Sequence, residues 1–142
     1  MDVAALPTSI HLEIVTPDRH VVHDSVTAVT VPGQEGYLGI LPGHAPLLSL
    51  LKVGELSYTK ESVTHFVAVN WGFVEVLPDR VIILAQTAER AEEIDVERAK
   101  RAKQRAEERL GKVTAADIDF ERARAALARA LARIQTVDRT RI

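Results

Sequence analysis

The segment GQEGYLGILPGHAPLL, residues 33–48, is the most informative stretch of this chain. Glycines and prolines alternate there with apolar residues, a pattern that predicts two tight turns separated by a very short buried strand. Glycine permits positive φ and close backbone approach, whereas proline fixes φ and removes a hydrogen-bond donor. We interpret the segment as the rim of a β domain that another molecule touches, with Glu35, Tyr37 and His44 as the candidate contact residues.

The sequence around this rim, from Ile10 to Ala85, has the pattern of β-strands. Ile10, Leu12 and Ile14 alternate with polar residues, and turn signals recur about every 8–12 residues, among them residues 70–72 (Asn-Trp-Gly). The pattern predicts a β-sandwich, or a flattened barrel, of about 8–10 short strands. We place this domain at residues 1–88.

After Ala85 the composition becomes that of helices, rich in alanine and arginine, with one more glycine at Gly111. We expect a first helix over residues 92–110 and a second helix capped by residues 114–117. The short connection makes the helices antiparallel neighbours. The predicted fold class is therefore β + α: an N-terminal β-sandwich followed by a C-terminal antiparallel two-helix hairpin at residues 89–142. Its alanine-rich apolar stripes bury little area, so the hairpin is a candidate movable element, with a static hairpin as the alternative.

Composition and charge exclude several classes of protein. No apolar run approaches the 18 or so residues of a membrane span, and the N-terminus lacks the basic residues of a secretory signal, so we expect a soluble protein. The chain has no cysteine, which excludes disulfides and thiolate catalysis and fits the cytoplasm.

Residues 1–90 carry 5 basic and 10 acidic side chains, a net charge of −5, whereas residues 91–142 carry 13 basic and 10 acidic side chains, a net charge of +3. This excess predicts an anionic partner or ligand for the hairpin.

Motifs for catalysis, metal binding and nucleic-acid binding are not found. No serine lies in a Gly-x-Ser-x-Gly elbow and no phosphate-binding Gly-x-x-x-x-Gly-Lys is present, so we interpret the chain as non-catalytic. His20 and His23 are the closest histidines in sequence, but residues i and i+3 of a strand face opposite sides, and no metal is expected. The basic excess is modest and lacks interleaved aromatics beyond Phe120, which argues against nucleic acid.

The arginines of the hairpin are the one set with chemical content. Arg98 and Arg105 are seven residues apart, and Arg129 and Arg133 are four apart, so each pair lines one side of its helix. If the helices bring those sides together, four guanidinium groups can converge on one polyanion, because their forks suit phosphate oxygens. Asp95 or Glu89 could then accept hydrogen bonds from a base or a sugar. The alternative is a solvated face stabilised by pairs along each helix.

Three segments together resemble the epsilon subunit of bacterial F-type ATP synthase. They are EGYLGILPGHAPLL at residues 35–48, IDVERA at residues 94–99, and DIDF at residues 117–120 with the arginines that follow it. The resemblance covers about residues 10–137. It implies a non-catalytic central-stalk subunit whose β-sandwich contacts the gamma subunit and the c-ring and couples their rotation. It also implies a hairpin that lies compact on the sandwich or extends into the alpha/beta catalytic hexamer and inhibits ATP hydrolysis.

The resemblance further implies a regulatory ligand and a location. The chain also departs from the family pattern at one position. No cofactor is required, and ATP is the ligand in nucleotide-binding members, held by positions that match Glu89, Asp95, Arg98, Arg105, Arg129 and Arg133. The implied location is the cytoplasmic face of the bacterial inner membrane, as a peripheral part of the proton-translocating complex. Where some relatives carry an acid between Gly36 and Leu38, this chain has Tyr37, and Glu35 is the candidate replacement in the c-ring contact. The alternatives are a free-standing nucleotide-sensing β-sandwich with a helical lid and, more distantly, a cupin-type enzyme.

Overall fold

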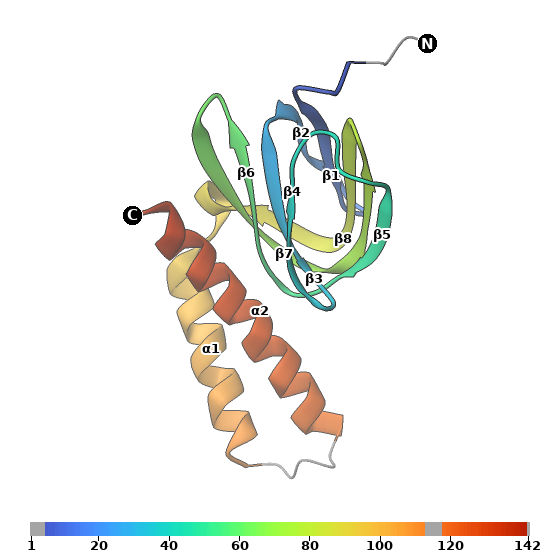
Figure 1. The fold of residues 1–142 in the computed structure, drawn as a ribbon. Helices are drawn as coiled ribbons and strands as arrows, with labels where there is room; N and C mark the ends of the chain where they lie inside the picture. The colour runs from blue at the N-terminus through green and yellow to red at the C-terminus, as the bar shows by residue number, and fades with distance from the viewer. Residues whose placement is uncertain (1–4, 113–117, 142) are drawn as a thin grey trace.

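The computed structural model describes residues 5–112 and 118–141, and it has a β-sandwich with two long helices along one side (Figure 1). The strands are β1 (Ile10–Val15), β2 (His20–Val26), β3 (Ala28–Gly33), β4 (Gly36–Ile40), β5 (Leu47–Leu51), β6 (Gly54–Lys60), β7 (Val63–Leu77) and β8 (Arg80–Arg90). A 3-10 turn, η1 (Ala91–Glu93), leads into α1 (Val96–Leu110), and α2 (Ile118–Thr140) follows. The predicted fold class, a β-sandwich followed by a helical hairpin, is confirmed.

Two of the eight strands are long, and they join the two layers of the sandwich. The first half of β7 pairs with β6 and with the end of β8, and its second half pairs with β5 and with the start of β8. β1 lies parallel to β8, and β2 pairs antiparallel with β1. On the other side β3 lies between β4 and β6. The prediction of short strands throughout is therefore wrong for β7, with 15 residues, and β8, with 11.

The turn predicted at residues 70–72 is also wrong, because β7 bends there without ending. Pairing with β8 continues on both sides of the bend, from Asn70 opposite Thr87 to Gly72 opposite Ala85. Trp71 takes a positive φ of 40°, and a Cβ on Gly72 would lie 1.7 Å from the carbonyl oxygen of Leu84. The local signal is real, but it marks a close approach of two strands.

The two turns predicted within residues 33–48 exist, and the strand between them is β4. Gly36 (φ 123°) and Gly43 (φ 87°) supply the backbone conformations that other residues rarely adopt. The prediction that this strand is buried is wrong: of its five residues, Ile40 alone is buried. The reason is that β4 stands at the end of the strand order and, among the described strands, has a neighbour on one side only.

The strand alternation places the core where the sequence predicts it. Ile10, Leu12 and Ile14 have no exposed surface, and Val81 and Ile83 on the parallel neighbour β8 are equally buried. The residues between them in each strand therefore point outward. These outward-pointing residues form one outer face of the sandwich, which runs across β2, β1, β8, the second half of β7, and β5.

The hairpin lies compact on the sandwich, with α2 against β6 and β7 and α1 packed along α2. The buried residues of the helices are mostly alanines: Ala99, Ala106, Ala123, Ala130 and Ala132, with Thr136 and Val137.

The first helix begins at Val96, later than predicted, because Asp95 caps it and residues 91–93 form a separate turn. The predicted cap at residues 114–117 lies outside the described residues. β8 continues to Arg90, two residues beyond the proposed boundary at 88. None of the helices in the described ranges is long and apolar enough to cross a membrane.

Candidate functional site

A polar pocket of about 310 Å³ opens where the end of β8, η1 and the two helices meet. Its lining residues are Glu89, Glu93, Asp95, Arg98, Ala99, Ala102, Arg105 and Arg133. Five of the six residues that the resemblance implicates in ATP binding therefore line one pocket, although β8, α1 and α2 are far apart in sequence. The volume is at the lower end of the range of about 300–1,000 Å³ typical of small-molecule sites.

Arg129 does not line this pocket. It is half-buried and lines a much smaller cleft of about 10 Å³ beside it, to which Glu89 and Arg133 also contribute. That space accommodates about one water molecule. Three of the four arginines that the resemblance implicates in ATP binding thus share one pocket, and the fourth lines the cleft next to it.

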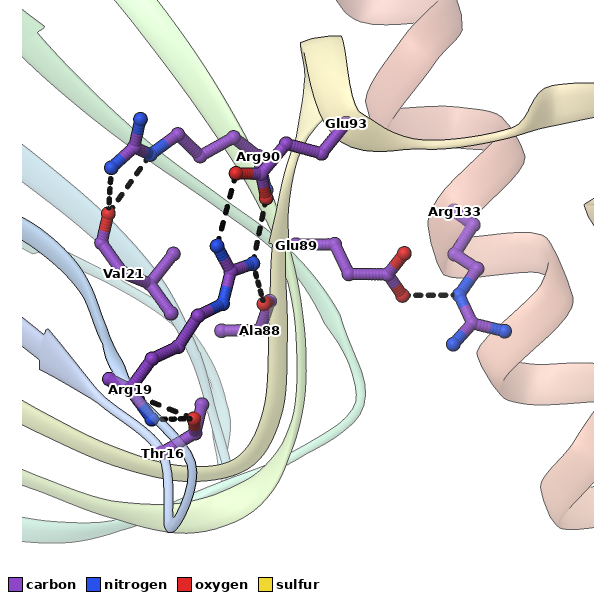
Figure 2. Close-up of polar contacts among 8 residues, drawn as sticks. All are labelled: Thr16, Arg19, Val21, Ala88, Glu89, Arg90, Glu93 and Arg133. Atoms are coloured by element: carbon purple, nitrogen blue, oxygen red, sulfur yellow. Dashed lines mark hydrogen bonds and ion pairs between the residues drawn. The ribbon is translucent and has the colours of Figure 1, made fainter.

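Two of the predicted acidic residues already have partners in the compact hairpin. Glu89 Oε1 accepts a hydrogen bond from Arg133 Nε at 2.6 Å, which links β8 to α2 (Figure 2). Asp95 Oδ1 accepts from the backbone N–H of Arg98 at 3.0 Å and so caps α1. Within residues 5–112 and 118–141, the guanidinium groups of Arg98, Arg105 and Arg129 form no ion pair. These three cations are therefore available to an anionic ligand.

Glu93, which the sequence reading did not single out, closes the pocket on the sandwich side. Its carboxylate accepts two hydrogen bonds from Arg19, at 2.7 and 3.1 Å, and it also accepts from the backbone N–H of Arg90 at 3.2 Å (Figure 2). The hydrogen bond from Arg19 is the main cause that lowers the pKa of Glu93. Arg90 in turn donates to the carbonyl oxygen of Val21, which fixes the end of β8 against β2. Glu93 accepts from the backbone N–H of Arg90, but the arginine side chain has no acceptor and cannot complete a capping box, so no local pattern indicates either Glu93 or Arg19.

The predicted rim residues lie at the two ends of β4 and on the strand itself. Glu35 and Tyr37 are exposed, at the turn before β4 and on β4 itself, whereas His44 follows the other end of the strand. A five-residue strand is about 17 Å long, so Glu35 and His44 are well separated. His44 Nδ1 donates to the carbonyl oxygen of Ala45 at 2.7 Å, a bond within its own loop.

The outer face of the sheet carries a row of exposed apolar side chains that sequence reasoning missed. Leu50, Phe73 and Leu84 are directly opposite one another on β5, β7 and β8, and they are 42%, 52% and 51% exposed. Trp71 and Leu48 extend the row, also exposed. Alternation predicts that these residues point outward, but only the strand order shows that they are neighbours. Contiguous exposed apolar surfaces often bind partners, so we treat this row as a candidate docking face.

The fold and these surfaces define a β-sandwich protein with a candidate docking face and an arginine-lined helical hairpin. Two family models divide the chain accordingly: the β-sandwich domain of the ATP synthase delta/epsilon chain matches residues 9–91, and its long alpha-helix domain matches residues 92–138. The chain belongs to the ATP synthase delta/epsilon chain family. This confirms the resemblance to the epsilon subunit, and with it the expectation of a non-catalytic subunit of that complex.

Individual relatives agree with this membership. The chain is 61% identical over 98 residues to an ATP synthase epsilon chain of Koribacter versatilis, which is 69% of each chain. It is 49% identical over 128 residues to ATP synthase epsilon chain 2 of Syntrophotalea carbinolica, covering 90% of this chain and 93% of that one.

Two solved structures share the fold. A chain in the Euglena gracilis mitochondrial ATP synthase structure (OSCP/F1/c-ring) superposes with a TM-score of 0.80 at 23% identity, over 98% of this chain and 85% of that one. A chain in the Tetrahymena thermophila mitochondrial ATP synthase central stalk/c-ring structure gives 0.57 at 16% identity, over 94% and 96%.

Proposed function

We propose that this chain is the epsilon subunit of the central stalk of a proton-translocating F-type ATP synthase. In this role the β-sandwich links the c-ring to the gamma subunit, and the hairpin regulates ATP hydrolysis in the alpha/beta catalytic hexamer. Family membership and the epsilon-chain relatives support this role over a free-standing nucleotide sensor. The subunit is then peripheral to the cytoplasmic face of the bacterial inner membrane, held there by the complex.

The proposed regulation of ATP hydrolysis rests on one observation, the set of residues that line the arginine-lined pocket. Its walls come from β8, α1 and α2, so a ligand within it contacts the sandwich and both helices at once. Such a ligand binds only while the hairpin is compact, and it must stabilise that state. We infer that ATP is this ligand, with Arg98 and Arg105 binding its phosphates. These residues are two helical turns apart, about 10 Å along the axis of α1, and guanidinium forks suit phosphate oxygens.

The way the hairpin is attached supports a mobile role. The buried side chains of α1 and α2 are mostly alanines, which contribute little apolar area to hold the helices in place. Two ion pairs add to the attachment, Arg133 with Glu89 at 2.6 Å and Arg139 with Glu55 at 3.3 Å. Ion pairs that remain partly in solvent are worth about 1 kcal/mol or less each. A hairpin held this weakly can leave the sandwich and reach the catalytic hexamer.

The test of nucleotide binding is the melting temperature (Tm) of the isolated full-length chain with and without ATP. At a hundredfold excess over Kd, ATP should stabilise the chain by about 2.7 kcal/mol and raise Tm. Arg98→Ala should abolish this shift. Arg101→Ala is the matched control, since Arg101 is an exposed arginine of the same helix that does not line the pocket. No shift of the wild type at millimolar ATP would contradict the proposal, as would equal damage from both variants.

The docking face is proposed to receive the gamma subunit, because the row Leu50, Phe73 and Leu84 is apolar and unpartnered in the isolated chain. Phe73→Asp should weaken binding to purified gamma subunit by at least about tenfold, since it places a charge in the centre of an apolar contact. Val63→Asp is the control, because Val63 is an equally exposed residue (55%) at the other end of β7. Unchanged gamma binding by Phe73→Asp would exclude this face.

Contact with the c-ring is proposed for the β3–β4 turn, where Glu35 and Tyr37 are exposed.

A further inference from the structure

Three side chains at the edge of the sandwich form a cluster with the composition of a metal site. His11 and Glu13 are two residues apart on β1 and share one face, and His23 on β2 is directly opposite Glu13. Sequence spacing pairs His23 with His20 on opposite sides of a strand and offers no His-x-His or Glu-x-x-His element, so it predicts no metal. The register of β1 and β2 brings His23 to His11 instead.

The three ligand atoms already converge. His11 Nε2 and His23 Nε2 are 2.9 Å apart, and Glu13 Oε1 is 3.7 Å from the first and 3.6 Å from the second. Donor atoms bound at 2.0–2.1 Å to a tetrahedral zinc ion are about 3.3–3.4 Å from each other. The present separations differ from these by a few tenths of an ångström, so small shifts and a rotation of the rings that turns both Nε2 lone pairs from each other toward the ion convert this arrangement into a coordination site. The side chains are 44%, 27% and 60% exposed for His11, Glu13 and His23, which leaves the remaining coordination position open to water.

We propose that His11, Glu13 and His23 bind a Zn²⁺ ion that joins β1 to β2. Two imidazoles and one carboxylate form a donor set that zinc accepts with water as the fourth ligand. Imidazole favours zinc, copper and nickel over magnesium and calcium, which prefer oxygen. Glu13 supplies the negative charge that favours a cation, whereas Arg80, the cross-strand neighbour of His11 on β8, opposes it. In the metal-free chain one imidazole donates its Nε2–H to the other, which accounts for the 2.9 Å contact.

The test is zinc binding to the full-length chain by isothermal titration calorimetry, with Co²⁺ absorption as the report of geometry. Zinc should bind at one site per chain, raise Tm, and displace Co²⁺ that shows the visible bands of tetrahedral coordination. His11→Gln, Glu13→Gln and His23→Gln should each weaken zinc binding by at least about tenfold, because even loss of an outer-shell partner costs that much. Each variant should retain the Tm of the wild type in the presence of EDTA, since all three side chains are partly exposed.

His20→Gln is the matched control, because His20 is an exposed histidine of the same strand outside the cluster. It should bind zinc as the wild type does. The proposal is overturned if Co²⁺ shows no tetrahedral bands, if Mg²⁺ competes as well as zinc, or if His20→Gln weakens binding as much as His23→Gln. None of the three proposed zinc ligands lines the arginine-lined pocket, so the result of the zinc experiment does not depend on the result of the ATP experiment.

Discussion

Replacing Gly72 by alanine tests the close approach of β7 and β8 on which the sandwich depends. A Cβ at this position would lie 1.7 Å from the carbonyl oxygen and 2.8 Å from the carbonyl carbon of Leu84. Contacts of a real Cβ are essentially never shorter than 3.0 Å, so the strands must separate by more than an ångström. Such a movement breaks hydrogen bonds of the ladder, and each backbone group left unpaired costs about 1–3 kcal/mol. Loss of two such groups gives about 2–6 kcal/mol, out of a total stability of about 5–15 kcal/mol.

The assay is urea unfolding followed by circular dichroism, together with thermal melting. At about 3–4 °C per kcal/mol for a chain of this size, Gly72→Ala should lower Tm by at least about 6 °C. Gly39→Ala is the matched control, since a Cβ on Gly39 of β4 meets nothing within 4 Å. It should be neutral, or stabilising by up to about 1 kcal/mol through the unfolded chain. A Gly72→Ala variant as stable as the Gly39→Ala variant would refute the reasoning.

Two further predictions concern the β6–β7 turn and the pocket. Ser62 has a positive φ of 67°, so Ser62→Gly should stabilise the chain by about 0.5–1 kcal/mol in urea unfolding, whereas Ser25→Gly, within β2, should destabilise it. Arg19→Gln should cost about 0.5–1 kcal/mol at neutral pH, because both partners of the Arg19–Glu93 pair remain about a third or more exposed. The pKa of Glu93 is lowered in the folded chain, so this stabilisation is present above its ordinary pKa of 4.5 and is lost as the pH falls through the lowered pKa. A stability difference between wild type and Arg19→Gln that persists unchanged in acid would contradict this account.

Local patterns in the sequence determined the two architectures and the content of the core. Alternation placed Ile10, Leu12 and Ile14 inside, because residues two apart in a strand share a face whatever the strand pairs with. The change to alanine and arginine after residue 85 marked the helices, because helix propensity acts within a few turns of chain. Seven-residue spacing likewise put Arg98 and Arg105 on one side of α1, and both line the pocket.

Tertiary structure decided which of these surfaces meet. The turn signal at residues 70–72 became a bend within β7, and Arg129 came to line the cleft next to the pocket that Arg133 lines. Pairing between strands brought His11 to His23, and it aligned Leu50, Phe73 and Leu84 into one row. The physical reason is that strand order and register are fixed by burial of the whole core, and a one-residue slip moves every side chain to the opposite face. Contacts between residues distant in sequence depend on that global choice, which no local spacing records.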